Sequence, residues 1–255
     1  MKILLTGASG LLGRAVYKEL KSKRPEYKIT GTAYSRAAGE IKKLNLLDDS
    51  SVETLIESLR PDLIIHSAAE RRPDVVKADT ERAEKLNIAA VETIARAASA
   101  AGSAVLYMST DYVFDGTSPP YRPEDKPNPL NHYGKMKLAG EEKVLDSCKH
   151  SLVLRVPILY GEVETLAESA VTIIAESISS DAESFHDNTA IRYPTHTEDV
   201  AGVICGLTDL LAEGKDVRGI YHWSSGSPYT KYGMAQVMAE IMGVDPKLIR
   251  EAEPD

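Results

Sequence analysis

The sequence has little of what disulfide-rich, cysteine-ligated or membrane proteins require. Its 255 residues include only two cysteines, Cys148 and Cys205, which are far apart and have no CxxC partner. Neither a disulfide framework nor a cysteine metal site is therefore indicated. No apolar run approaches the roughly 20 residues that cross a bilayer, and the N-terminus MKILLTGASG does not have the pattern of a signal peptide. These absences predict a reduced, cytoplasmic protein without a membrane partner.

Basic and aromatic residues are also scarce. Lys and Arg number 30 against 38 Asp and Glu, which gives a formal net charge of −8. This balance offers no basic surface to offset the charge of nucleic-acid phosphates. Aromatic residues make up 6% of the chain, with one tryptophan, so no platform for stacking bases is indicated. We therefore expect no nucleic-acid partner.

What the sequence does contain is a regular alternation of apolar strands and amphipathic helices through its first 160 residues. The strand candidates are continuous apolar runs, as expected when both faces of a sheet are buried. Strands that alternate with helices in this way form parallel sheets covered by helices. The predicted strands are residues 2–6, 27–33, 63–66, 104–108 and 152–156, and the predicted helices are 11–21, 50–59, 80–101 and 130–145.

The alternation loosens after Gly161. Helical patterns at 166–179, 196–211 and 232–242 are separated by short strand candidates at 191–193 and 219–223. We predict a sheet domain over residues 1–160, completed by returns from the C-terminal part, and a smaller substrate-binding lobe over residues 161–255. Ligands of open α/β sheets bind at the carboxyl edge of the strands, which is where such a lobe is expected. The fold class predicted is α/β, a doubly wound parallel sheet with a small C-terminal lobe.

A glycine-rich turn follows the first predicted strand and opens the first helix. Gly7 permits a tight turn, Gly10 lets the backbone approach a pyrophosphate, and Gly13 lets the helix pack against the sheet. The free amides at the start of the helix can then hold phosphate oxygens. A glycine triplet alone is a weak signal, but after a strand and before a helix it predicts the dinucleotide site of a Rossmann-type domain.

The end of the second strand indicates which dinucleotide binds. NAD-selective sites place an acidic residue there for the ribose 2′-hydroxyl, but here the segment TAYSR has no carboxylate. Arg36 can pair with a 2′-phosphate and Ser35 can add a hydrogen bond, which favours NADP. The alternative is that Arg36 is a solvated surface residue.

A second group of residues carries acid–base chemistry. Tyr133 and Lys137 are four residues apart, so they share one face of a helix and can reach one pocket. We expect the Lys137 ammonium to lower the pKa of Tyr133, which can then protonate a carbonyl oxygen as hydride arrives at its carbon. The segment Ser109-Thr110-Asp111 comes at the end of a parallel strand, and a hydroxyl there can hydrogen-bond the same carbonyl. A bare YxxxK is common by chance, and it gains weight from this context.

With TGASGLLG, a strand-end Ser/Thr and YGKMK in this order, the chain resembles the extended short-chain dehydrogenases/reductases. The resemblance implies a catalytic set of Thr110, Tyr133 and Lys137, with Asn87 as a structural active-site asparagine. It implies further cofactor contacts in the glycine turn, at the adenine, where the cofactor crosses the sheet, and beside the nicotinamide. These are Leu11, Leu12, Leu47, Asp48, Ala68, Ala69, Pro157 and Ile158, in addition to Tyr133 and Lys137.

Two branches of that family fit the remaining sequence. STDYVFDG, YGKMKLAGE and THTEDVA resemble dTDP-4-dehydrorhamnose reductases, which reduce a nucleotide-linked 4-keto sugar. The longer stretches SAAERRPDVV, DYVFDGTSPPYRPED, RVPILYGEVETLAESAVT and GIYHWSSG resemble the non-catalytic, NADP-binding β subunits of methionine adenosyltransferase. The first resemblance implies an oxidoreductase with a nucleotide-sugar substrate. The second implies a regulatory subunit in S-adenosylmethionine biosynthesis, with the catalytic subunit as its partner.

The resemblance also bears on the end of the chain. Both branches continue past their last helix, whereas this sequence stops at Glu253-Pro254-Asp255. The C-terminal lobe is therefore expected to lack its usual end, and docking functions carried by that end are in question.

Several other residues allow two interpretations. His66 follows an apolar strand and is expected to be a buried, hydrogen-bonded residue rather than a ligand. His186 and His196 lack metal-site spacing, so loop or capping roles are expected and no metal is predicted. Arg71 and Arg72 are either an anion clamp or subunit contact, or part of a solvated loop, and the sequence favours neither.

Overall fold

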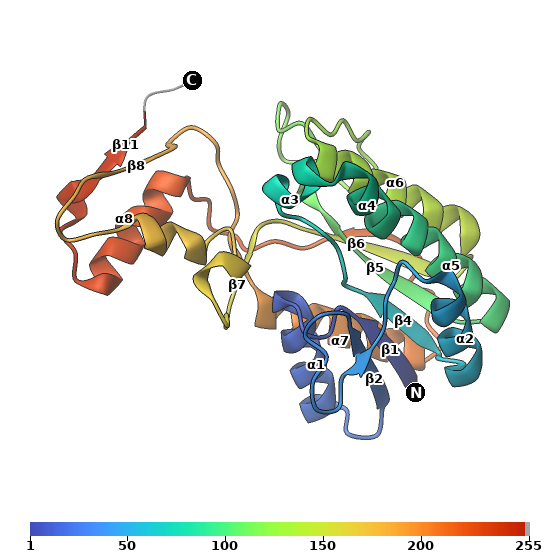
Figure 1. The fold of residues 1–255 in the computed structure, drawn as a ribbon. Coiled ribbons are helices and arrows are strands. Elements are labelled where there is room, and N and C mark those ends of the chain that lie inside the picture. Colours follow the sequence, from blue (N-terminus) through green and yellow to red (C-terminus); the bar gives the residue numbers. More distant parts are fainter. Residues whose placement is uncertain (253–255) are drawn as a thin grey trace. The chain divides into compact units, whose positions relative to one another are not determined.

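The computed structural model describes residues 1–252 of the chain, and the end at Glu253-Pro254-Asp255 lies outside these residues. The chain forms two compact units (Figure 1). The first consists of Met1–Val156 and Val200–Trp223, and the second consists of Pro157–Asp199 and the residues from Ser224 onward. Within residues 1–252, no helix is long and apolar enough to cross a membrane.

The first unit is built on a seven-stranded sheet with the order β10-β6-β5-β4-β1-β2-β3, in which all neighbouring strands are parallel. This confirms the predicted doubly wound sheet. Crossovers from β1 outward in both directions place the carboxyl ends of β1 and β4 next to each other, which is the position where such sheets bind ligands. The strands are β1 (Lys2–Thr6), β2 (Lys28–Ala33), β3 (Lys42–Lys43), β4 (Leu63–His66), β5 (Ala104–Thr110), β6 (Ser151–Val156) and β10 (Gly219–His222).

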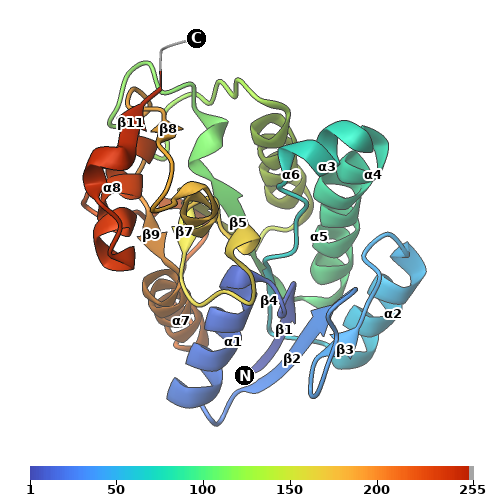
Figure 2. The same cartoon turned by 60° about the vertical axis from the view of Figure 1, so that its left-hand side comes forward.

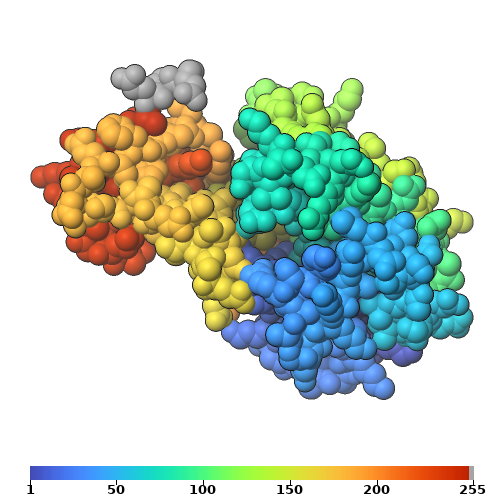
Figure 3. All heavy atoms as spheres, in the orientation of Figure 1, coloured from blue at the N-terminus to red at the C-terminus, as the bar shows by residue number. Residues whose placement is uncertain are grey.

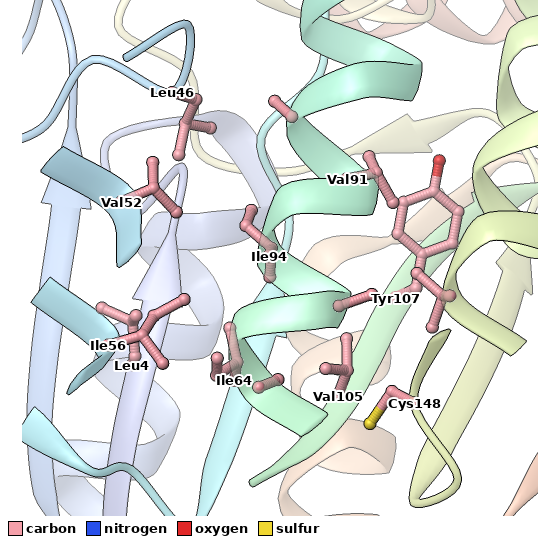
Figure 4. Packing of buried hydrophobic residues seen from close by; sticks show 14 of the residues in the cluster. Leu4, Leu46, Val52, Ile56, Ile64, Val91, Ile94, Val105, Tyr107 and Cys148 are labelled. Atoms are coloured by element: carbon pink, nitrogen blue, oxygen red, sulfur yellow. The ribbon is translucent and has the colours of Figure 1, made fainter. Parts of the chain in front are cut away.

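Helices cover both faces of this sheet (Figure 2). On one face lie α1 (Leu11–Lys23) and α7 (Thr197–Ala212), and on the other lie α2 (Asp49–Leu59), α5 (Ala90–Ala101) and α6 (His132–Ser147). Under α2, α5 and α6 the side chains form one continuous core (Figure 4). It includes Leu4, Ile64, Val91, Ile94, Val105, Tyr107 and Val153. On the face that Figure 3 shows, the surface of this unit is formed by segments coloured from blue through teal to green.

The helix predicted at residues 80–101 is interrupted. It consists of α4 (Thr80–Glu84), a π-helical segment (Lys85–Ala89) and α5, and a further short helix, α3 (Pro73–Ala78), precedes it. The π-helical segment contains Asn87, whose side-chain amide bonds to the backbone of the loop before α3. Such single-turn insertions are frequent at functional sites.

The second unit has a small core packed around α8 (Lys231–Met242). Two two-stranded sheets accompany it, formed by β8 (Ser184–His186) with β11 (Ile249–Glu251), and by β7 (Leu159–Tyr160) with β9 (Thr195–His196). The strand expected at 191–193 is a single bridge between Arg192 and Tyr229.

The predicted helix at 166–179 is also absent, because the segment forms two 3-10 turns, Leu166–Glu168 and Thr172–Ser177. Between them, the hydroxyl of Ser169 accepts hydrogen bonds from the amides of Val171 (3.0 Å) and Thr172 (3.3 Å). A side chain that captures backbone amides in this way competes with the helix. That role of Ser169 cannot be read from apolar periodicity.

Candidate functional site

The glycine turn after β1 has the geometry of a phosphate cradle. Gly7 has a φ of 71°, and a Cβ at this position would lie 2.7 Å from the amide nitrogen of Ala68. A Cβ at Gly13 would lie 2.0 Å from the carbonyl oxygen of Gly7. Only glycine fits both positions, because these close neighbours are backbone atoms. The turn thus closes tightly against the segment after β4 and leads directly into α1, which packs on the sheet.

The start of α1 has free hydrogen-bonding capacity for a ligand. Gly10 is its N-cap, no side chain caps it, and its first turn has no acidic residue. The amides of Leu11 and Leu12 therefore face the turn with the positive end of the helix dipole, as a pyrophosphate requires. The residues of this turn fit the dinucleotide that the sequence predicts.

The glycine turn also has a guanidinium beside it, which the motifs in the sequence do not indicate. Arg14, in the first turn of α1, donates a hydrogen bond from Nη1 to the carbonyl oxygen of Ser9 (2.9 Å). It thereby places a positive charge over the glycine loop. Its position directly after Gly13 is the feature of the sequence that could have indicated this role. Arg36, at the end of β2, is exposed, as is Ser35.

The residues predicted to contact adenine lie before α2. Asp48 is the N-cap of α2, since its Oδ1 accepts from the amide of Ser51 (3.1 Å) and its Oδ2 from the Ser51 hydroxyl (2.6 Å). These hydrogen bonds hold the pKa of Asp48 below its usual range. The structure therefore gives this carboxylate a capping role, and its contact with adenine, like that of the exposed Leu47, remains a prediction.

Tyr133 and Lys137 lie on the first turns of α6, as their spacing indicates. Asn131 caps this helix by accepting a hydrogen bond at Oδ1 from the amide of Gly134 (2.7 Å). Lys137 is buried, and its Nζ lies 3.9 Å from the centroid of the Tyr107 ring. Tyr107 stands between α5 and the yellow-green ribbon of α6 (Figure 4). The face of the Tyr107 ring can stabilise the Lys137 ammonium at this distance.

The expected effect of Lys137 on Tyr133 is wrong. Burial raises the pKa of Tyr133 to about 12, and the lowering by the nearby Arg71 is the second-largest influence. Lys137 is not among the groups that shift it, and burial lowers the pKa of Lys137 itself to about 7. Spacing on a helix predicts that two side chains share a face, but the cost of burying each charge decides the sign of the shift.

Thr110 lies at the carboxyl end of β5, close to the tyrosine. Its Oγ1 accepts from the amide of Tyr112 (3.2 Å) and donates to Asp111 Oδ1 (3.2 Å). The Tyr112 ring meets the Tyr133 ring edge-on, with centroids 6.4 Å apart. The structure therefore brings the strand end and the first turn of α6 together, as the sequence predicted. The role of Thr110 toward a carbonyl substrate remains a prediction.

Asn87 is buried in the π-helical segment and holds the loop after β4. Its Oδ1 accepts from the amide of Glu70 (3.0 Å), and its Nδ2 donates to the Glu70 carbonyl oxygen (2.8 Å). This paired hydrogen bond fixes the backbone that follows Ala68 and Ala69. Asn87 is thus a positioning residue for the loop that carries Arg71.

The remaining predicted residues have structural roles that the sequence left open. Pro157 and Ile158 begin the second unit, where Ile158 packs against the core around α8 and its carbonyl accepts from the amide of Thr195 (2.9 Å). His66 is buried as expected, with Nδ1 2.7 Å from the Thr6 hydroxyl, and burial lowers its pKa to about 3. Among residues 1–252, no three His, Cys, Asp or Glu side chains gather as a metal site.

The model of the RmlD substrate-binding domain family matches residues 1–254 of this sequence. The chain belongs to the RmlD substrate-binding domain family. This confirms the resemblance to extended dehydrogenases/reductases that the glycine turn and the YGKMK segment indicated.

Within this family, the similarity differs between two kinds of relatives. Methionine adenosyltransferase 2 subunit beta from Xenopus laevis is 47% identical over 250 residues, which cover 98% of this chain and 74% of that protein. The dTDP-4-dehydrorhamnose reductase of Aggregatibacter actinomycetemcomitans is 31% identical over 239 residues, covering 89% and 74%. The crystal structure of dTDP-4-dehydrorhamnose reductase from Bacillus anthracis in complex with NADP has a TM-score of 0.82 and 26% identity, and covers 98% of this chain and 83% of that one.

Proposed function

We propose that this RmlD-family protein is an NADP-binding regulatory subunit of methionine adenosyltransferase. The observation that carries the proposal is the 47% identity to a subunit beta of that enzyme across 98% of the chain, against 31% to a reductase. The match covers 98% of the chain, so it extends well beyond the glycine turn and the YGKMK segment.

The proposed cofactor site uses local groups, because the protein as a whole is acidic. The amides at the start of α1 would hold the pyrophosphate, and Arg36 with Ser35 would bind the 2′-phosphate of NADP. Lys137 and Tyr133 would lie at the ribose and nicotinamide end. When bound, the cofactor supplies or accepts hydride, whereas the residues of this chain bind and orient it.

The partner is tested by mixing the purified chain with a catalytic subunit of methionine adenosyltransferase and separating the mixture by size. We expect the two proteins to co-elute at micromolar concentration. The same experiment with the catalytic subunit and a dTDP-4-dehydrorhamnose reductase in place of this chain is the control. Separate elution of a folded chain and the catalytic subunit would contradict the proposal.

Cofactor selectivity depends on Arg36. Replacing Arg36 with alanine should weaken NADP binding by about 10- to 100-fold, because charge-assisted hydrogen bonds to the 2′-phosphate are lost. NAD, which has no 2′-phosphate, should bind almost as before. Titration calorimetry with both dinucleotides measures this, with Lys23→Ala as a control for the loss of one exposed positive charge. Equal losses for both dinucleotides would refute the assignment.

A second candidate function is reduction of a nucleotide-linked 4-keto sugar, because Thr110, Tyr133 and Lys137 are all present. In this reaction Thr110 would orient the carbonyl, and Tyr133 would give its proton to the carbonyl oxygen. The structure makes that step costly. Burial raises the pKa of Tyr133 to about 12 and so opposes loss of the proton, and Arg71 is the cation that partly offsets this effect.

The reductase alternative is tested by following NADPH oxidation with dTDP-4-dehydro-6-deoxy-L-mannose. The regulatory proposal predicts a rate no higher than the background without protein, and the same rate for Tyr133→Phe. A rate well above background that is lost in Tyr133→Phe would favour the reductase. Binding of NADPH, measured in the same samples, shows that a missing rate does not result from a missing cofactor.

A further inference from the structure

A row of polar side chains is buried beneath α6, next to the proposed cofactor residues. Glu141 lies one helical turn after Lys137, and both are almost fully buried, with 1% and 3% exposure. The Ser109 hydroxyl donates to Glu141 Oε1. Arg155 on β6 donates from Nε to Glu141 Oε1 (2.9 Å) and from Nη2 to Oε2 (2.6 Å). Glu141 and Arg155 therefore form a two-point ion pair without access to water.

Such a pair is a poor means of stabilising a fold. The desolvation of two charges offsets most of their attraction, and apolar residues of similar volume serve stability as well or better. A role for this pair therefore has to be sought in what its groups contact. Arg155 contacts the loop between β5 and α6, and its Nη1 also lies 3.2 Å from Nε2 of His222 on β10. Glu141 shares a helix face with Lys137, one turn away on α6.

Arg155 connects the pair to that loop. Its Nη1 donates to the Pro123 carbonyl oxygen (3.2 Å), and its guanidinium carbon lies 5.1 Å from the centroid of the Phe114 ring. Phe114 in turn stacks on Tyr121 with centroids 4.2 Å apart and planes 8° from parallel. Arg155 thus holds residues from both halves of the loop.

The same loop begins at the predicted active site and is held by hydrogen bonds within itself. It starts directly after Thr110, and Tyr112 near its start meets Tyr133. Asp115 accepts hydrogen bonds from the Tyr121 hydroxyl (2.6 Å) and from Asn128 Nδ2 (2.8 Å), which closes the loop on itself. A displacement of Arg155 would therefore move Phe114, which lies two residues after Tyr112 in the same loop.

We infer that Glu141 and Arg155 are a positioning pair, which fastens the 111–130 loop to α6 and maintains Lys137 as an ammonium over the Tyr107 ring. The inference deepens the proposed function, because it concerns the residues proposed to hold the ribose and nicotinamide end of NADP. Neither residue of the pair touches the cofactor in this role. Each acts through Lys137 or through the loop.

The charges around Lys137 explain why Glu141 matters there. Burial lowers the pKa of His66 to about 3 and raises the pKa values of Tyr107 and Tyr133, so these three groups are neutral near pH 7. Burial also lowers the pKa of Lys137, and Glu141 is the group that raises it. The ionisable groups that interact with Lys137 are Glu141 on α6, His66 on β4 and Tyr107 on β5. Tyr133 precedes Lys137 by one turn of α6, and Arg155 on β6 and His222 on β10 lie on the other side of Glu141.

The test measures Lys137 and the loop directly, in the chain without cofactor. Lys137 is titrated by NMR of 13C-labelled lysine side chains, with its signal identified by its loss in Lys137→Arg. In the unaltered protein we expect this signal to titrate near pH 7, far below the other lysines. Glu141→Gln should move the midpoint to lower pH. Glu142→Gln, which removes the same charge from the exposed neighbouring position of the helix, should leave the midpoint unchanged.

Hydrogen exchange of the loop gives the second readout. The double variant Glu141→Gln/Arg155→Met removes both charges and keeps apolar volume under Phe114, so it is expected to fold even where Glu141→Gln does not. The amides of residues 111–130 should exchange about tenfold faster in it, because their anchor is lost. In Glu142→Gln they should exchange as in the unaltered protein.

If the pair has no effect on Lys137 or on the loop, neither the Lys137 midpoint nor the exchange of the loop amides should change in the variants. If the double variant shows the unaltered midpoint of Lys137 and unaltered loop exchange, the inference is wrong. The same conclusion follows if Glu141→Gln folds and behaves like Glu142→Gln in both measurements. Failure of NADP to bind the unaltered chain would contradict the proposed cofactor but not these two readouts, which need no cofactor.

Discussion

Replacing Gly13 with alanine is expected to abolish useful dinucleotide binding, with a loss of about 100-fold or more in affinity. The added Cβ would lie 2.0 Å from the Gly7 carbonyl oxygen and 2.9 Å from the Cα of Ala8. Both are backbone atoms of the turn itself, so relief requires the turn to open by about 1 Å. Displacements of this size at a site that positions a ligand cost about two orders of magnitude.

The matched control for this variant is Gly206→Ala. Gly206 lies in α7, and nothing is within 4 Å of the position that its Cβ would take. This control should bind NADP normally and gain slightly in stability, because alanine favours a helix interior over glycine. Fluorescence titration with NADPH measures the affinity of both variants. An affinity of Gly13→Ala within about threefold of the control would show that the turn is not the phosphate site.

Replacing Arg155 alone is expected to destabilise the first unit strongly. The change to alanine leaves the carboxylate of Glu141 buried without its ionic partner, which costs about 3–5 kcal/mol of the free energy of unfolding. At about 2–4 °C per kcal/mol, the melting temperature should fall by roughly 10 °C. Adding Glu141→Gln to Arg155→Ala should restore part of this loss, because it removes the unpaired charge.

The exposed pair of Arg218 with Asp216 provides the comparison for Arg155. Its two side chains are 56% and 62% exposed, so Arg218→Ala should leave the melting temperature almost unchanged. Calorimetry measures the melting temperatures of Arg155→Ala, of Arg155→Ala combined with Glu141→Gln, and of Arg218→Ala. Equal melting temperatures for Arg155→Ala and Arg218→Ala would mean that Glu141 reaches water or another cation in the variant. This result would contradict the assignment of Glu141 and Arg155 as a buried ion pair.

The parts of the site that depend on local sequence could be predicted. Gly7, Gly10 and Gly13 follow a strand and precede a helix, and their order alone indicates the turn. Tyr133 and Lys137 share a helix face because they are four residues apart. The alternation of apolar strands with helices was sufficient to predict the parallel sheet.

The parts that depend on distant packing could not be predicted. Glu141 and Arg155 are far enough apart in sequence that no spacing rule connects them. The sequence indicates Ser109 only as part of the polar segment at the end of a strand, and not as a partner of Glu141. Side chains alternate along β5, so Ser109 faces Glu141 while Thr110 does not. The pKa of Tyr133 was predicted in the wrong direction for the same reason. Burial follows from the assembled sheet and helices, and it outweighs the charge that spacing had suggested.

We propose that this RmlD-family chain regulates a methionine adenosyltransferase and does not reduce a sugar. The most direct test is the rate of S-adenosylmethionine formation by the catalytic subunit as increasing amounts of this chain are added. The account predicts that KM or kcat changes by about fivefold or more and then saturates, as binding at a second site requires. A rate that stays constant up to a large excess of folded, NADP-bound chain would contradict it.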